Sequence, residues 1–436
     1  MGQPYGDEVW ASAATGELPD SVDVVVIGGG IVGVSSAWSL ARRGVKVLLV
    51  EKKSIASEQS GRNWGFVRQQ GRDPAELPLA MMANRIWGNL EGDLGRTVDW
   101  RQGGNVALAD TDEKVAAYEE WSGLAADSGL DTRLIGMEQV RDLVRGLRGD
   151  WRVAIYTPSD GHVNPLRATL AIAGAAESAG AQILTGCAAE AIEVSGGRVV
   201  GVRTALGHVR AASVVLAGGI WSSRLASTAD VDLPQGIVTN SVSVTRPLPR
   251  LTDAGVWSRE LAFRQLANGQ LLVSAEIATE VDLYLNDVRR ARLFMPMFWR
   301  NRATFSLNVS RLSSIKRRVR MKRWDLEEPL PNMRQLNVVY RHLRARLPDL
   351  GDITPVRAWA GHIDGTPDGL PIIESLSSPH GLVLATAFSG HGFALGPAVG
   401  SVVADLVVDG RTSVELNPMR LGRFSERTFG QPKSIL

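Results

Sequence analysis

Three glycines near the start of the chain are spaced so that the backbone can approach a pyrophosphate. Gly28, Gly30 and Gly33 follow an apolar run and precede a helical stretch, in the pattern GxGxxG. Gly28 permits a tight turn, Gly30 leaves no Cβ in the way of a phosphate, and Gly33 lets the helix pack closely on the strand. The N–H groups of Ile31 and Val32, in the first turn of that helix, favour negative charge. We therefore predict a dinucleotide-binding turn.

An acid and a base follow the second strand of this unit. Glu51 stands directly after the apolar run 45–50 and is followed by Lys52. A carboxylate at this place accepts hydrogen bonds from ribose hydroxyls and disfavours a 2′-phosphate, which argues against NADP. A glycine motif alone is weak evidence, whereas two strands, a helix and an acid in this order form a specific signal.

Polar or glycine-rich turns recur at three distant places. The first spans 57–65, the second follows the strand 213–216, and the third opens a helix that extends to about Val408. Such turns let the backbone come close to a ligand. They supply the remaining candidates for cofactor contacts, which are Ser60, Gly61, Arg62, Asn63, Gly218, Gly219, Trp221, Ser389, Gly390, His391, Gly392 and Phe393.

Apolar periodicity predicts the elements that position these turns. Strands are expected at 24–27, 45–50, 182–184, 191–194, 199–204, 213–216, 241–245, 270–274 and at the start of 381–400, and helices at 31–43, after Pro78, at 167–179 and up to 408. Because nucleotide-binding character returns in separate pieces, we predict interleaved domains. Residues 22–95, 158–236 and 352–415 form the cofactor domain, and 96–157 and 237–351 form the substrate domain.

Composition excludes several classes of protein. The 436 residues carry a net charge of only +2, which gives no global reason to expect nucleic-acid binding. The single cysteine, Cys187, excludes an internal disulfide and paired-cysteine zinc motifs, so we expect no metal site and a reducing compartment. No basic start with an apolar stretch opens the chain, and no run of ~20 apolar residues could span a bilayer. We expect a cytoplasmic protein, soluble or peripheral to a membrane.

Two C-terminal motifs are more specific than the glycine pattern. They are WAGHIDGTPDGLPII at 359–373 and AFSGHGF at 387–393. Together with SGRN at 60–63 and VVLAGGIW at 214–221, they resemble the D-amino-acid oxidase (DAO) family of FAD-dependent oxidoreductases, which includes glycine oxidase, sarcosine oxidase and related amine dehydrogenases. The resemblance implies an α/β plus α+β fold, in which a Rossmann-like FAD-binding domain is interleaved with a mostly antiparallel substrate domain.

The resemblance also implies a reaction and a cofactor. The C–H next to an amine nitrogen is transferred as hydride to flavin N5, and water hydrolyses the resulting imine. The helix that begins near Gly390 can stabilise negative charge on the reduced flavin. A cysteine that attaches the flavin in monomeric sarcosine oxidase would fall near Gly361, so we expect non-covalent FAD. The lysine that promotes oxygen reaction in that enzyme is replaced by Leu272, which favours a dehydrogenase.

The residues expected to meet the substrate depart from those of the relatives. Two positions at which relatives carry a carboxylate-binding cation hold Ile363 and Ala394 in this chain. Arg68 aligns with an arginine that binds substrate carboxylate in sarcosine oxidase, and it is the leading anchor. A surface arginine or a pyrophosphate contact is the alternative for that residue. Trp64 and Gln69 are weaker candidates for lining the pocket.

Three further polar residues are candidates for catalysis. Asp364 can pair with a substrate ammonium and His362 can take a proton near neutral pH, although Asp364 can equally cap a turn. His391 is expected beside the flavin; alone, it would be taken for a histidine that fills a turn.

One strongly basic stretch stands apart from the family motifs. Residues 288–324 contain twelve Lys or Arg and no Asp or Glu, mixed with apolar and aromatic side chains. The stretch can lie on anionic lipid, bind an acidic partner subunit, or pair with acids of the same chain.

Two functions remain from the sequence. One is an enzyme that oxidises a small amine or amino acid and passes electrons to oxygen, a quinone or another redox protein. The other is a flavin-carrying electron-transfer or scaffold subunit of a multi-subunit or membrane-associated dehydrogenase. The polar groups Arg68, His362 and Asp364 favour the enzyme.

Overall fold

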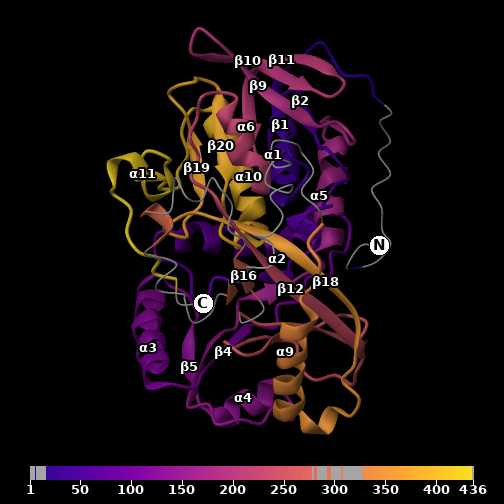
Figure 1. The fold of residues 1–436 in the computed structure, drawn as a ribbon, viewed down its shortest axis with the longest axis vertical. Helices are drawn as coiled ribbons and strands as arrows, with labels where there is room; N and C mark the ends of the chain where they lie inside the picture. The colour runs from indigo at the N-terminus through magenta and orange to yellow at the C-terminus, as the bar shows by residue number, and fades with distance from the viewer. Residues whose placement is uncertain are drawn as a thin grey trace.

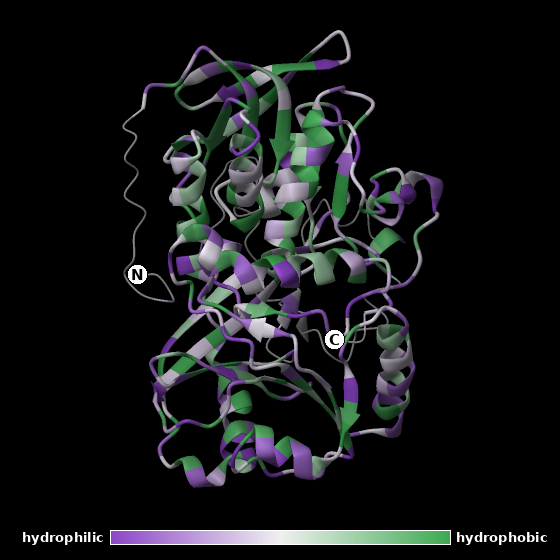
Figure 2. Ribbon diagram, turned by 180° about the vertical axis from the view of Figure 1, so that it is seen from behind, coloured by the Kyte–Doolittle hydropathy of each residue, from purple (hydrophilic) through white to green (hydrophobic). Residues whose placement is uncertain are grey.

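The computed structural model describes Tyr5 and residues 16–276, 279–281, 292–295, 306–307 and 328–434. The chain forms two sheets with their own helices, one in the upper half of Figure 1 and one in the lower half. Strands carry much of the hydrophobic colour in both halves (Figure 2). The predicted fold class is confirmed: one sheet is parallel at its centre, and the other is mostly antiparallel.

The first sheet has the strand order β19-β20-β11-β1-β2-β8, with β9 and β10 attached through β11. Its strands are β1 (Ser21–Ile27), β2 (Val47–Val50), β8 (Gln182–Leu184), β9 (Ala189–Ser195), β10 (Arg198–Thr204), β11 (Gly207–Leu216), β19 (Ile372–Ser375) and β20 (Leu382–Thr386). The strands β20, β11, β1, β2 and β8 run parallel. Their carboxyl ends therefore meet at one edge, where ligands bind in such sheets.

Helices cover both faces of this sheet. They are α1 (Ile31–Ala41), α2 (Leu77–Leu94), α5 (Pro165–Ser178), α6 (Ser222–Ser227), α10 (Gly392–Val408) and α11 (Arg423–Glu426). The contact between α1 and α10 is close because two glycines of α10 lie against α1. A Cβ on Gly396 would stand 2.6 Å from Ile31, and one on Gly400 would stand 2.5 Å from the backbone of Ser35. This contact sets the position of the N-terminal end of one helix relative to that of the other.

The second sheet has the order β17-β16-β12-β15-β14-β13-β4-β6-β5, with β18 on β12. Its strands are β4 (Asn105–Ala109), β5 (Arg133–Ile135), β6 (Val153–Thr157), β12 (Gly236–Pro247), β13 (Gly255–Trp257), β14 (Ala262–Gln265), β15 (Gln270–Ser274), β16 (Thr279–Val281), β17 (Ser306–Leu307) and β18 (Pro355–Gly365). Helices α3 (Asp112–Asp127), α4 (Met137–Leu143) and α9 (Met333–Arg346) belong to this half (Figure 1). The sequence segment 352–415, expected in the cofactor domain, thus begins with a strand of the other sheet.

Short elements complete the fold. The pair β3 (Phe66–Val67) and β7 (Gly161–His162) and the 3-10 turns η1 (Gln59–Gly61) and η2 (Gly219–Trp221) lie near the meeting point of the two halves, whereas η5 (Pro348–Leu350) follows α9 and η6 (Asn417–Met419) contacts β19. Every predicted strand and helix overlaps an observed one, whereas other elements, among them α3, α4, α9, β4–β6, β13 and β14, were not predicted. Within the described ranges, no helix is long and apolar enough to cross a membrane.

The glycine contact between α1 and α10 predicts opposite effects for two Gly→Ala changes. Gly400→Ala forces a methyl group into the α1 backbone and should destabilise the fold by about 1–3 kcal/mol. Gly88→Ala, within α2, meets no atom within 4 Å and should stabilise by about 0.5–1 kcal/mol. Urea unfolding of both variants measures this; equal effects would contradict the packing argument.

Candidate active site

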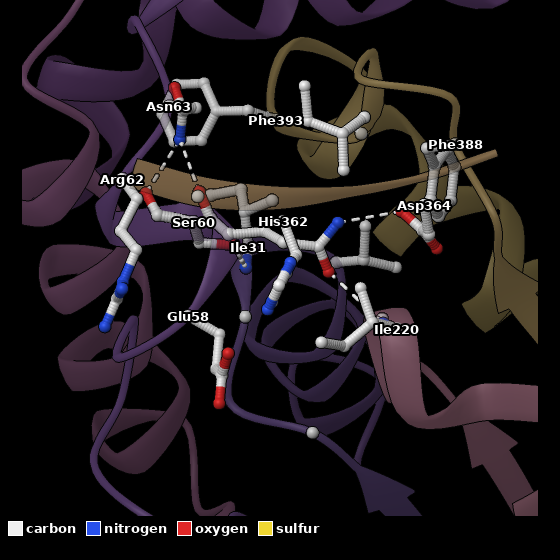
Figure 3. Close-up of a pocket in the computed structure, with 18 of the residues that line it drawn as sticks. Ile31, Glu58, Ser60, Arg62, Asn63, Ile220, His362, Asp364, Phe388 and Phe393 are labelled. Carbon is white, nitrogen blue, oxygen red and sulfur yellow. Dashed lines mark hydrogen bonds between the residues drawn. The ribbon is translucent and has the colours of Figure 1, made fainter. Parts of the chain in front are cut away.

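One cavity of about 380 Å³ lies between the two halves of the molecule. Figure 3 shows Ile31, Ser60, Asp364 and Phe393 around it, although these residues come from distant parts of the chain. Of the predicted site residues, Gly33, Gly61 and the weaker candidate Gln69 do not line this cavity, and the others do. The structure therefore brings the predicted turns and the predicted catalytic candidates together in one place.

The glycine motif forms the turn that opens α1. Gly28 has φ +113°, a conformation that suits glycine, and a Cβ on Gly33 would lie 1.9 Å from the carbonyl oxygen of Gly28. Gly33 thus serves helix packing, as the motif predicts. Glu51 accepts hydrogen bonds from the N–H groups of Gly29 (2.7 Å) and Lys53 (2.8 Å), and burial raises its pKa. Its carboxylate lies at the cavity wall and also holds the turn.

The loop 57–65 is tied by its own side chains. Ser60 Oγ accepts a hydrogen bond from the first N–H of α1, that of Ile31, at 2.8 Å. Asn63 donates to the carbonyl oxygens of Gln59 and Ser60 and accepts from Gly65 N–H. The predicted residues Ser60 and Asn63 therefore shape the cavity wall as well as line it.

Two cations of the cavity wall, Arg62 and Lys52, have defined contacts. Arg62 donates to the carbonyl of Ala360 and pairs with Glu328 at 2.8 Å. Lys52 pairs with Glu58 at 3.0 Å, and its Nζ lies 3.7 Å from the ring centre of Trp221. Burial lowers the pKa of Lys52 against the effect of Glu58.

The turn before α10 is tightly wound. Ala387, Ser389 and Gly390 all have positive φ, and Ser389 Oγ accepts a hydrogen bond from Thr366 N–H. α10 begins at Gly392 with His391 as its N-cap, close to the predicted start. The N-terminal ends of α1 and α10 both open into the cavity, which provides two sites of partial positive charge.

A buried cluster of charges lies behind the turn at His391. Glu76 is fully buried, and its Oε2 lies 2.8 Å from His391 Nδ1 and 3.8 Å from Arg72 Nη1. Burial opposes ionisation of Glu76, but His391, Arg72 and Arg68 lower its pKa. Burial and Arg72 lower the pKa of His391. The pair is therefore an ionised Glu76 that accepts a hydrogen bond from the Nδ1–H of a neutral His391.

Arg68 is buried in the cavity wall, so the surface alternative is wrong. It donates to the carbonyl of Gln70, and its guanidinium lies 5.2 Å from the ring centre of Trp257. Burial and the charge of Arg72 lower the pKa of Arg68 to about 9, which leaves it cationic at neutral pH. Trp64 packs on Trp257 with ring centres 4.8 Å apart, so an aromatic wall adjoins the cation.

The loop that carries Arg68 is held by buried amides. Asp160 accepts hydrogen bonds from the backbone and side chain of Gln69 and from the backbone of Gln70. Burial raises the pKa of Asp160 to about 6. Gln70 Oε1 accepts from Asn105, and its amide donates to carbonyls of β4 and β6. Gln69 does not line the cavity but supports the residue that does.

β18 contributes the remaining candidates. His362 is buried, and its Nδ1 lies 3.1 Å from Thr239 Oγ1 on β12. Asp364 receives hydrogen bonds from the side-chain amides of Gln59 and Gln235, both at 2.8 Å (Figure 3 shows the first). Burial raises the pKa of Asp364, and these hydrogen bonds oppose that effect.

Sequence reasoning did not find Gln59, Gln235, Arg72, Glu76 or Trp257. No motif marks the two glutamines, because their partner lies far away in the chain. Arg72 and Glu76 are four residues apart just before an apolar helix, a spacing that weakly indicates an ion pair. Cys187 lies in the hydrophobic core and does not line the cavity. The basic segment 288–324 lies outside the described residues except 292–295 and 306–307.

Comparison with known proteins places the chain in a family. The model of the DAO family, FAD dependent oxidoreductase, matches residues 23–406. The chain is similar to 4-methylaminobutanoate oxidase (formaldehyde-forming) of Paenarthrobacter nicotinovorans, with 26% identity over 94% of this chain and 46% of the relative. It is also similar to sarcosine oxidase subunit beta of Rhizobium meliloti, with 25% identity over 97% of this chain and 93% of the relative.

A solved structure gives the same picture. L-amino acid deaminase from Proteus myxofaciens, in complex with anthranilate, superposes with a TM-score of 0.87 at 28% identity, over 95% of this chain and 96% of the other. The chain spans less than half of the length of the first curated relatives it matches.

The buried cluster predicts a stability effect that depends on pH. Glu76→Gln removes the negative charge between Arg72 and His391 and should destabilise the fold at pH 7 by about 3–5 kcal/mol. Because the folded pKa of Glu76 is lowered, its contribution is present above the unfolded pKa of about 4.3 and is lost as pH falls through the folded value. The difference between variant and wild type should therefore shrink in acid.

Chemical denaturation at pH 7 and at pH 3.5 to 4 measures this difference. Glu119→Gln, an exposed acid of α3, is the control and should change stability little at either pH. A Glu76→Gln protein as stable as wild type at pH 7 would show that the carboxylate is not ionised in the fold.

Proposed function

Because the chain belongs to the DAO family of FAD-dependent oxidoreductases, we propose that it oxidises the C–N bond of an amino acid or secondary amine. The observation that carries the proposal is that nucleotide-type turns line one part of this cavity and a buried arginine with an aromatic wall lines another part. Relatives named as a 4-methylaminobutanoate oxidase, a sarcosine oxidase subunit and an L-amino acid deaminase support the same class of substrate.

FAD fits the residues that line the cavity. The glycine turn at Gly28–Gly30 leaves room beside the N-terminus of α1, and Gly390 and Gly392 flank the N-terminus of α10. The first helix end suits the diphosphate, and the second suits negative charge on the flavin ring. When bound, FAD supplies the acceptor for a hydride from the carbon next to the substrate nitrogen.

The chain supplies binding, orientation and exclusion of water. Arg68 fixes a substrate carboxylate, because a guanidinium can donate two parallel hydrogen bonds and so orients the ligand. Trp64 and Trp257 cover the apolar part of the substrate and exclude water from the same region. A second arginine, Arg72, stays paired with Glu76 and supports the positive potential there.

Two histidines have separate tasks in this proposal. His362, on β18, accepts a proton from the substrate ammonium, so that the amine is neutral when it reacts. A hydrogen bond between Thr239 Oγ1 and His362 Nδ1 orients the imidazole ring of His362. His391 stays neutral because burial and the charge of Arg72 lower its pKa, against the effect of Glu76, and it contacts the cofactor at the start of α10.

We further propose that FAD is held non-covalently and that electrons pass to oxygen, a quinone or another redox protein. Cys187, the single cysteine, is buried outside the cavity, which removes one means of attachment. Its burial also raises its pKa and so disfavours a reactive thiolate. Denaturing the purified flavoprotein should release all of its FAD into the supernatant. Flavin retained by the precipitated chain would contradict non-covalent binding.

A second candidate function is that of a flavin-carrying subunit in a larger assembly. The match to a sarcosine oxidase subunit beta over 93% of that protein favours it. The basic segment 288–324 would then contact a partner subunit or a membrane surface.

Anaerobic reduction separates the two functions. The flavin absorbance of the purified protein should bleach when sarcosine, prolines, opines or amino acids of either hand are added without oxygen. A protein that holds FAD but is bleached by none of them would favour the carrier function. A protein that takes up no FAD would overturn both.

The charge of Arg68 predicts a pH dependence for carboxylate binding. Because the pKa of Arg68 is about 9, the affinity for a carboxylate without an amine, such as propionate, should be constant between about pH 7 and 8 and fall as pH rises through 9. Arg68→Gln should weaken this binding about 10–100-fold at pH 7 and abolish the fall. Perturbation of the flavin spectrum measures the affinity.

The matched control is Arg148→Gln, which removes an exposed arginine of the substrate domain. It should leave propionate binding unchanged at every pH. Unchanged binding in Arg68→Gln would assign the carboxylate to another cation.

A further inference from the structure

Asp364 contacts three separated segments beside the cavity, at Gln59, Gln235 and Ala387. It lies on β18 of the substrate-domain sheet and is 3% exposed. Its Oδ1 accepts from Gln59 Nε2 and its Oδ2 from Gln235 Nε2, each at 2.8 Å. The backbone N–H of Ala387, in the turn before α10, also donates to its carboxylate.

The two glutamines extend these contacts to the turn 218–221. Gln59 Oε1 accepts a hydrogen bond from Ile220 N–H at 3.3 Å. Gln235 Nε2 also donates to the carbonyl of Gly219 at 2.8 Å. Gly219 has φ +52°, and a Cβ there would stand 2.4 Å from Gln59 Oε1, so its glycine leaves room for the glutamine. One carboxylate thus connects the loops at 59, 219 and 387.

The orientation of both amides requires an acceptor at residue 364. Gln59 has its oxygen on Ile220 N–H, and Gln235 has its oxygen on Ser223 N–H at 3.2 Å. Neither can turn its oxygen toward residue 364 without leaving a buried N–H facing an NH₂ group. An asparagine would offer one oxygen and one NH₂ group to two donors, whereas a carboxylate accepts from both.

We propose that Asp364 is a positioning residue that holds the three cofactor turns in register with the substrate-domain sheet. This inference rests on the proposed function, since it concerns the FAD cavity. It assigns the carboxylate of Asp364 to the protein's own donors rather than to the substrate ammonium, since Gln59, Gln235 and Ala387 N–H already donate to it. Through its hydrogen bonds, the carboxylate of Asp364 also connects β18, which carries His362, to the cofactor turns.

Exchanging the amide of Gln59 and the carboxylate of Asp364 tests the proposal, because the exchanged pair can form the same number of hydrogen bonds. Asp364→Asn places an NH₂ group against that of Gln59 or Gln235. In the double variant Asp364→Asn with Gln59→Glu, the new glutamate still accepts from Ile220 N–H and also accepts from the asparagine NH₂ group. The asparagine oxygen still accepts from Gln235, so the number of charges and of these hydrogen bonds is unchanged.

The measurements are the FAD dissociation constant of the apoprotein and the visible absorption and circular dichroism of the bound flavin. Asp364→Asn should weaken FAD binding about tenfold or more and alter the flavin spectrum. The double variant should return both to near wild type. Gln59→Glu alone, which places two carboxylates together, should be impaired. Asp352→Asn, an exposed aspartate ahead of β18, is the matched control and should behave as wild type.

The contrary outcomes are distinct. An Asp364→Asn protein with wild-type FAD affinity and spectrum, but a raised KM for the amine that the exchange does not restore, would overturn the proposal in favour of ammonium pairing. If Asp364→Asn does not fold, a soluble, yellow double variant supports the proposal, and an insoluble one overturns it. Failure of the wild type itself to bind FAD would instead overturn the proposed function.

Discussion

The close packing of α1 on α10 is the contact on which the cavity depends. Gly396 and Gly400 let the helices approach until atoms of α10 lie against Ile31 and Ser35. Because both helices start at the carboxyl edge of the parallel sheet, this approach brings two helix N-termini to one cavity. α2 fixes the arrangement from behind, since Trp87 donates to the carbonyl of Ala394 at 2.7 Å. Two positive helix ends in one enclosed space favour a ligand with negative charge at two places along its length.

The buried charges of Arg68, Arg72 and Glu76 contribute to the electrostatic potential of the cavity. Burying Arg68, Arg72 and Glu76 is expensive, and such pairs add little to stability over apolar side chains of the same size. Their value lies in the potential that they maintain where water is scarce. With Glu76 engaged by Arg72 and His391, the guanidinium of Arg68 keeps a positive potential toward the cavity. The aromatic wall of Trp257 lowers the local polarity and strengthens that potential.

Sequence patterns predicted the local half of this site and missed the part built by contacts between distant residues. The glycine turn and the start of α10 follow from spacing within a few residues, and both were predicted. Gln59 and Gln235 carry no such signal, because an isolated glutamine reads as a surface residue until its partner is known. α9 buries Leu336, Val339, Tyr340 and Leu343, a helical spacing that the pattern contained, but its arginine-rich surface concealed it.

Because β18 belongs to the second sheet, its residues connect that sheet directly to the turns of the first. The motif at 359–373 falls within the segment 352–415 that was predicted for the cofactor domain, yet β18, which includes its first part, pairs with β12 along residues 236–245. His362 and Asp364 are two residues apart, so their side chains lie on the same face of β18, and both line the cavity. The hydrogen bonds of Asp364 then bind the antiparallel sheet to turns of the parallel one. A displacement of the substrate domain would therefore move the cofactor turns with it, and the two halves must act as one unit at this edge.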